Sequence, residues 1–204
     1  MRTFLLSVIA AALLLAPATL NASTDVYDNG AINGTFDAYS IATSLYGFEV
    51  SDSFTLGATT TLTGADVGLW VIGGDTPSSL TWDIGTSFFD ASLGTGTATP
   101  SNNYWGNSWG YDIYDSTFSL PSVTLGPGTY YLSLSGTTTE AQNIFWDETV
   151  GPSSAYQLNG AGPIGSESFR LYSGGSTVPE PASFGLIGMG LLGMATFLRR
   201  RISR

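Results

Sequence analysis

Hydrophobic and polar residues alternate in short runs through the middle of the chain, and turns that contain glycine separate these runs. In residues 129–134, the side chains of Tyr130, Leu132 and Leu134 fall on one face of an extended chain, because successive residues of a strand point to opposite faces. Short strands with this turn spacing are typical of an antiparallel sandwich. Residues 23–172 are therefore predicted to form an all-β domain, a single antiparallel jelly-roll-like β-sandwich. The predicted strands cover residues 46–56, 60–63, 66–72, 80–84, 113–120, 129–134, 143–146 and 168–172.

A longer apolar run without this alternation lies near the start of the chain, over residues 4–16. Arg2 precedes it and small residues follow it, which is the order of charge, apolar segment and cleavage site found in secretory signals. We predict a signal peptide with a signal helix over residues 1–22, cut after Ala18 or Ala22. The alternative is a first membrane helix, but the run is shorter than the roughly 17 to 25 residues that a span needs.

A second apolar run covers residues 182–198, close to the shortest length that spans a bilayer as a helix. Basic residues beside a membrane helix stay on the cytoplasmic side. The sequence thus predicts a transmembrane helix over 182–198, a cytoplasmic basic tail over 199–204, and the sandwich on the outside. This direction agrees with export across the inner membrane by the signal peptide. The arginines that form the cytoplasmic stop signal are Arg199, Arg200, Arg201 and Arg204.

The segment before this helix has the composition of a flexible linker over residues 173–177 and of an extended, accessible peptide over residues 178–181. The peptide consists of Val178, Pro179, Glu180 and Pro181. Followed by an apolar helix and an arginine cluster, it resembles the PEP-CTERM sorting signal, here residues 178–204. The resemblance implies recognition by an exosortase, an integral membrane enzyme that removes the helix, in Gram-negative bacteria that make exopolysaccharide and biofilm matrix. A simple tail anchor is the alternative.

Charge is distributed unevenly along the chain. Of the 16 acidic residues, all except Glu180 lie between Asp25 and Glu167, whereas only one of the six basic residues, Arg170, lies in the predicted sandwich. Fifteen acidic residues against one arginine give this domain a formal net charge of −14. Such a surface repels nucleic acid and anionic lipid and attracts cations.

Oxygen ligands for calcium are available in two places, at Asp25, Asp28 and Asn29, and at Asp112 with Asp115. Calcium takes six to eight oxygen atoms from several loops, and no EF-hand spacing is present. Acidic surface residues more often serve solubility. We therefore expect no cofactor, while calcium binding stays open and the sequence does not fix a metal.

The absence of histidine, cysteine and lysine limits the chemistry of the chain. It excludes a Ser-His-Asp triad, a cysteine nucleophile, a Schiff base and a zinc site of histidine or cysteine. Two carboxylates about 5 to 10 Å apart could hydrolyse glycosides, and Trp146 beside Asp147 and Glu148 offers an apolar setting for one of them. Because adjacent side chains point apart, we expect a non-enzymatic protein and assign no catalytic residues.

Residues 102–112 mix aromatic residues, amides and glycines, and we predict a long exposed loop there. Aromatic rings can stack on sugar rings while amides and carboxylates bind hydroxyl groups. Packing of the same rings against the end of the sandwich is the alternative and the commoner role of tryptophan. The candidate glycan contacts are Tyr104, Trp105, Trp109 and Tyr111.

Together these features predict an exported cell-surface or extracellular-matrix protein. The resemblance to the PEP-CTERM signal implies for it a structural or adhesive role in association with exopolysaccharide and biofilm. The expected partners are the exosortase, the inner membrane and extracellular polysaccharide, and no nucleic acid. A carbohydrate-binding module that uses the aromatic loop is the alternative, and a carboxylate-dependent glycosidase is a third, less favoured hypothesis.

Overall fold

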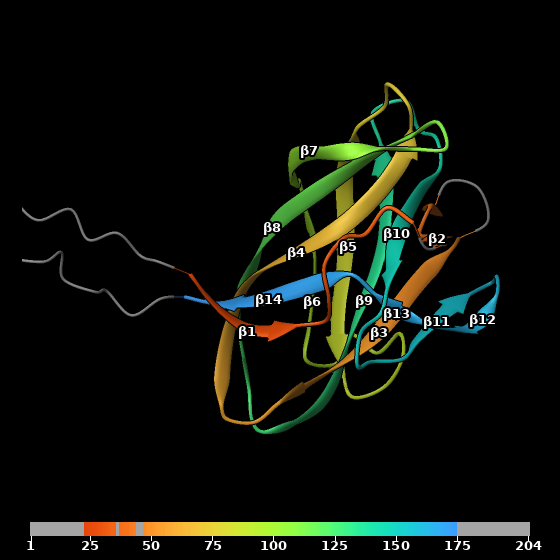
Figure 1. The fold of residues 1–204 in the computed structure, drawn as a ribbon. Coiled ribbons are helices and arrows are strands. Elements are labelled where there is room, and N and C mark those ends of the chain that lie inside the picture. Colours follow the sequence, from red (N-terminus) through yellow and green to blue (C-terminus); the bar gives the residue numbers. More distant parts are fainter. Residues whose placement is uncertain (1–22, 36, 44–46, 175–204) are drawn as a thin grey trace, which may run out of the picture. The chain divides into compact units, whose positions relative to one another are not determined.

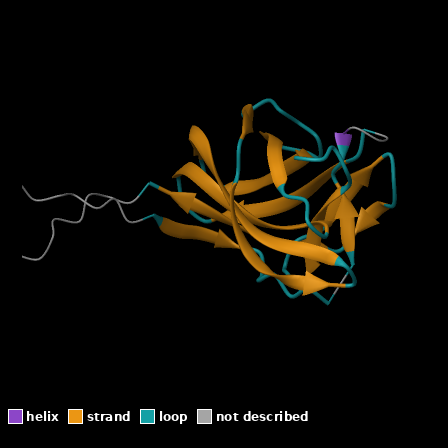
Figure 2. Ribbon diagram, turned by 90° about the horizontal axis from the view of Figure 1, so that it is seen from above, coloured by secondary structure: helices purple, strands orange, loops and turns teal. Residues whose placement is uncertain are grey.

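The computed structural model describes residues 23–35, 37–43 and 47–174, and strands dominate this part of the chain (Figures 1 and 2). No helix within it is long and apolar enough to cross a membrane. The predicted signal helix and the predicted transmembrane helix 182–198 lie outside the described residues. The strands are β1 (Thr24–Asp28), β2 (Ala38–Ser40), β3 (Glu49–Leu56), β4 (Thr60–Ile72), β5 (Pro77–Gly85), β6 (Gly94–Ala98), β7 (Ser101–Ser108), β8 (Tyr111–Leu125), β9 (Gly128–Thr138), β10 (Ile144–Thr149), β11 (Ala155–Leu158), β12 (Gly162–Ile164), β13 (Ser166–Glu167) and β14 (Phe169–Ser173).

Strand β4 is the central strand of an eight-stranded antiparallel sheet. One edge of β4 pairs with β8, and its other edge pairs first with β14 and then with β10. The sheet is completed by β7 on β8, by β1 on β14, and by β2 and β13 on β10. The second sheet has six strands in the order β12-β11-β3-β9-β5-β6, and its pairings are also antiparallel.

Two antiparallel sheets with almost no helix confirm the predicted all-β class, whereas the jelly-roll arrangement stays a prediction. The strands predicted over 60–63 and 66–72 are in fact the single strand β4. Gly64 does not end that strand, because the ladder with β8 only shifts register between Leu62 and Gly64 and then continues. The short strands β1, β2, β6, β11, β12 and β13 were not predicted, since few of their residues alternate in hydrophobicity.

The prediction of a long loop over residues 102–112 is wrong. Residues 101–108 form β7, which pairs with β8 from Ser101 opposite Thr117 to Ser108 opposite Tyr111. Only Trp109 and Gly110 remain as the turn of this β7–β8 hairpin. The ladder satisfies backbone groups that a loop would leave to water.

The core lies between the two sheets and follows the alternation along their strands. Val67, Leu69 and Val71 of β4 are buried there, as are Leu132 and Leu134 of β9, and all five belong to one continuous hydrophobic cluster. Burial of this apolar surface is the main stabilising contribution to such a domain. Tyr130, which shares their predicted face in β9, packs only partly buried against this cluster.

Trp82 is one of the largest fully buried side chains. Its indole ring packs against positions of the neighbouring strand that have no side chain. Trp82 in β5 lies opposite Gly96 in β6. A Cβ atom at Gly96 would stand 2.8 Å from the Cζ2 atom of this ring, and one at Gly94 would stand 3.3 Å from Cζ3. These two glycines therefore make room for the tryptophan.

Replacing Gly96 with alanine should lower the free energy of unfolding by about 1–2 kcal/mol, because the added methyl group overpacks a rigid, buried ring. Urea unfolding followed by circular dichroism measures the change. Gly106→Ala is the matched control, since Gly106 also lies in a strand and has nothing within 4 Å of its missing Cβ. Equal stabilities of the two variants would show that the space beside Trp82 is not limiting.

Candidate functional site

The outer face of the eight-stranded sheet carries the side chains that alternate with the core. On β4, Asp66 and Trp70 point to this face. The chain that follows β1 crosses it, held by hydrogen bonds to β10. The backbone N–H of Asn33 donates to the carboxylate of Asp147 at 3.3 Å, and the N–H of Glu148 donates to the carbonyl oxygen of Asp37 at 3.0 Å. Two hollows open beside this crossing segment.

The first, the arginine hollow, has a volume of about 190 Å³ and is lined by Asp66, Trp105, Asp115, Arg170 and the chain at residues 30–32. The guanidinium of Arg170 donates to both carboxylate oxygens of Asp66 and lies 3.8 Å from the carboxylate of Asp115. Burial and the neighbouring Asp66 raise the pKa of Asp115, and Arg170 opposes them. Because Arg170 is already paired, a ligand in this hollow would meet hydrogen-bond acceptors and the indole ring of Trp105 rather than an unpaired cation.

Asp66 has a second hydrogen-bond partner, the hydroxyl group of Tyr172, which donates to its carboxylate at 2.5 Å. Burial, together with this bond to Asp66, raises the pKa of Tyr172. Asp66 itself is almost fully buried. Tyr172 and Arg170 thus fix one carboxylate oxygen from two sides, which holds the wall of the hollow in place.

The second, the aromatic hollow, has a volume of about 160 Å³ and is lined by Asp37, Ala38, Trp70, Trp109, Tyr111 and Phe145. The ring of Tyr111 contacts the rings of both Trp70 and Phe145, with centroid distances of 6.2 and 5.6 Å. Trp70 is buried, and its indole N–H donates to Asp147 at 2.6 Å. This bond fixes the ring that forms the inner wall.

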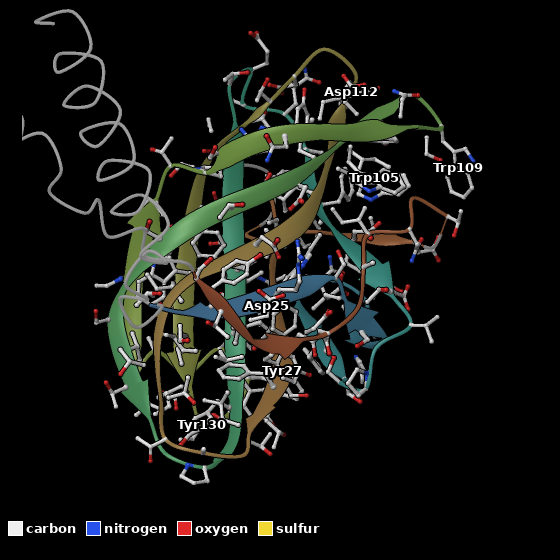
Figure 3. The ribbon with its side chains drawn as sticks, turned by 60° about the vertical axis from the view of Figure 1, so that its left-hand side comes forward. Asp25, Tyr27, Trp105, Trp109, Asp112 and Tyr130 are labelled. Carbon is white, nitrogen blue, oxygen red and sulfur yellow. The ribbon has the colours of Figure 1, made fainter. Side chains whose placement is uncertain are left out.

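The structure separates the four predicted glycan residues. Trp109 and Tyr111 border the aromatic hollow, whereas Trp105 borders the arginine hollow. Trp105 is 48% exposed and lies against Gly34, where a Cβ atom would approach its ring to 2.8 Å. Tyr104 borders neither hollow and makes an edge contact with the ring of Tyr114 at 5.9 Å. Figure 3 shows Trp109 at the tip of the hairpin and Trp105 farther in, over the sheet.

Sequence reasoning missed four of the six residues that line the aromatic hollow, Asp37, Ala38, Trp70 and Phe145. The alternation of residues 66–72 could have placed Trp70 opposite the core, because Leu69 and Val71 flank it. No local signal brings Phe145 beside it, since the two meet only through the pairing of β4 with β10.

The calcium candidates are not gathered into one site. Asn29 is buried, and its amide donates to the carboxylate of Asp52 at 3.0 Å. Asp112 accepts from the backbone N–H of Gly74 at 2.8 Å, while Asp115 faces the arginine hollow. In residues 23–35, 37–43 and 47–174, no group of three or more acidic side chains could hold a metal ion.

Asp147 and Glu148, the carboxylates considered for glycoside hydrolysis, are neighbours in β10, and their side chains point to opposite faces of the sheet. Asp147 is fully buried under the crossing segment, and burial raises its pKa while Trp70 and Asn33 lower it. Burial likewise raises the pKa of Glu148. This pair therefore does not face one common cleft.

A buried carboxylate pair lies on the core side of the sheets, away from both hollows, and sequence analysis did not identify it. Asp52 and Glu167 are both 0% exposed, and the backbone N–H of Glu167 donates to Asp52 at 2.8 Å. Neither carboxylate oxygen of Glu167 has a hydrogen-bond partner among the described residues. Burial raises the pKa of Asp52 to about 6 and, reinforced by Asp52 and Glu148, raises that of Glu167 well above its usual range.

A family model matches the C-terminal segment of the chain. The model of the PEP-CTERM protein-sorting motif matches residues 177–201. The match contains the sorting peptide 178–181 and Arg199, Arg200 and Arg201, and Arg204 lies three residues beyond it; all of them fall outside the described residues. No curated protein matches the chain. The motif implies an exported protein that is anchored transiently through its C-terminal region and processed by an exosortase, a membrane protein.

The buried carboxylates predict how stability depends on pH. Because their folded-state pKa values lie above the unfolded ones, the folded state binds more protons at these two groups. Their contribution to stability is therefore fully present below about pH 4, the unfolded pKa of a carboxyl group, and is lost as the pH rises through 6 and above. Each group contributes about 1.4 kcal/mol per pH unit within its window. Glu167→Gln should therefore be more stable than the wild type at pH 7 and show a shallower pH dependence in urea unfolding.

Glu140→Gln is the control for this experiment, since Glu140 is exposed, and it should keep the wild-type slope. A Glu167→Gln variant that is less stable than the wild type at pH 7, with an unchanged slope, would mean that Glu167 is ionised and held by a partner.

Proposed function

We propose that this protein is a non-enzymatic component of the cell surface or extracellular matrix, whose sandwich has a structural or adhesive role in association with exopolysaccharide. The observation that supports it is the PEP-CTERM motif at residues 177–201, which marks an exported, exosortase-processed protein. A domain sorted in this way meets extracellular polymers rather than cytoplasmic substrates.

The negative charge of the sandwich limits which polysaccharides it can associate with. Its only cation, Arg170, is paired with Asp66, so fixed negative charge faces the surroundings. Anionic polymers would be repelled unless a cation bridges them, whereas neutral ones would not. We therefore propose association with neutral exopolysaccharide, through hydroxyl groups and ring faces.

A carbohydrate-binding module is the second candidate, and the aromatic hollow is the observation in its favour. A carboxylate-dependent glycosidase is less favoured, because Asp147 and Glu148 lie on opposite faces of β10. We accordingly propose that no residue is catalytic and that the protein binds sugar without hydrolysing it.

Exosortase processing predicts that the mature protein ends within or near residues 178–181. Intact mass of the protein from membrane and matrix fractions of its native bacterium measures both termini directly. We expect a matrix form that lacks both the signal peptide and the apolar and basic residues after 181. A matrix form that still ends at Arg204 would contradict processing and indicate a retained tail anchor.

Matrix association predicts that the purified mature protein sediments with insoluble exopolysaccharide from the same bacterium. Because neutral contacts carry the proposed association, the pelleted fraction should change less than twofold between 50 and 500 mM salt. Bovine serum albumin, another acidic protein, serves as the control and should stay in the supernatant. Failure of the wild-type protein to sediment would overturn the proposed function.

A further inference from the structure

The turn of the β7–β8 hairpin contains a residue that the fold itself does not favour. Ser108 pairs with Tyr111, so Trp109 and Gly110 are the two central residues of the turn. Both have positive φ, 52° and 86°. Two-residue turns of this kind favour asparagine or aspartate followed by glycine, because a bulky L-residue is strained in the left-handed region. Trp109 occupies the position where asparagine would fit best.

The indole of Trp109 is also placed unfavourably for solubility, since 76% of the residue is exposed. A ring that packed to stabilise the hairpin would be covered instead. It borders the aromatic hollow, which Tyr111 and the buried Trp70 also line. Strain and exposure at one residue are the signature of a side chain kept for contact with a ligand.

The other walls of the hollow are held before any ligand arrives. Trp70 is 4% exposed and donates to Asp147, and the ring of Tyr111 contacts the rings of both Trp70 and Phe145. Rings fixed in this way lose little conformational freedom on binding. Trp109 at the turn is the exposed wall that completes them.

The size and polarity of the hollow indicate the ligand class. The hollow has a volume of about 160 Å³. Sites that enclose a whole small ligand measure about 300–1,000 Å³, so this one fits a single unit of a chain that continues into solvent. Its lining has aromatic faces and one carboxylate, Asp37, and no cation. Aromatic faces suit the C–H face of a sugar ring, and Asp37 can accept from a hydroxyl group but would repel a uronate.

We propose that the aromatic hollow binds one pyranose ring of a neutral polysaccharide, with Trp109 stacked on the ring and Asp37 accepting from a hydroxyl group. The inference rests on the proposed association with exopolysaccharide and names the residues and the sugar class that carry it. Trp105, Tyr104 and the arginine hollow are not part of this site.

The test is Trp109→Asn, which replaces the strained tryptophan with the residue that the turn prefers. The variant should unfold at a higher urea concentration than the wild type, because asparagine followed by glycine suits positive φ. Its retention in native gels that contain a neutral polysaccharide should fall at least tenfold, because the stacking ring is gone. The probes are the native exopolysaccharide, a neutral β-glucan, a neutral mannan and polygalacturonate.

Tyr104→Ser is the matched control, since Tyr104 is also an exposed aromatic residue of the hairpin, at 61%, but borders neither hollow. It should be retained like the wild type. Full retention of Trp109→Asn, with the wild type still sedimenting with exopolysaccharide, would overturn this site and leave the proposed function intact. Retention of the wild type by polygalacturonate alone would overturn the neutral class.

Another occupant of the hollow would give a different result. If Trp109→Asn abolished self-association in sedimentation velocity while leaving polysaccharide retention unchanged, the hollow would be a contact between copies of this chain, and the sugar site would be wrong. Loss of sedimentation with exopolysaccharide by the wild type itself would instead mean that the proposed function fails.

Discussion

The pairing of β4 with three other strands is the constraint on which the rest of the structure depends. Its edges hold β8, β14 and β10, and every remaining strand of that sheet is attached to one of these. Side chains alternate along β4, so Leu69 and Val71 enter the core while Trp70 faces outward. A slip of one residue would exchange the two sets. The free energy of core packing thereby also fixes the position of the aromatic hollow, although the hollow contributes nothing to the core.

Those parts of the fold that depend on the alternation of hydrophobic and polar residues could be predicted from the sequence. The buried sets on β4 and β9 follow from hydrophobic periodicity, and the all-β class follows with them. The aromatic hollow could be predicted only in part, because Trp109 and Tyr111 are neighbours along the hairpin whereas Phe145 reaches Trp70 across a ladder of distant strands. The loop expected over 102–112 shows the same limit, since glycine and asparagine in a strand resemble a loop until the partner strand is known.

The buried carboxylates of the domain accept hydrogen bonds almost entirely from uncharged donors. Asp52 is held by the amide of Asn29, the hydroxyl of Ser153 and the backbone of Glu167, and Asp147 is held by an indole N–H. Such an arrangement avoids the desolvation of a second charge that a buried ion pair requires. It also explains why sequence analysis did not identify Asp52 as buried: on a strongly acidic chain, nothing local distinguishes a buried carboxylate from a solvated one.

The first and last strands of the domain end side by side, with Thr24 opposite Ser173, and Ser173 in turn lies opposite Leu62 near the start of β4. The aromatic hollow is built around Trp70, eight residues farther along β4, or about 25 Å at roughly 3.3 Å per residue. Attachment through residue 174 and a polymer held at the hollow would thus act at opposite ends of one strand. Tension between them would run parallel to β4 and shear many backbone hydrogen bonds together, the direction in which a sheet resists force best.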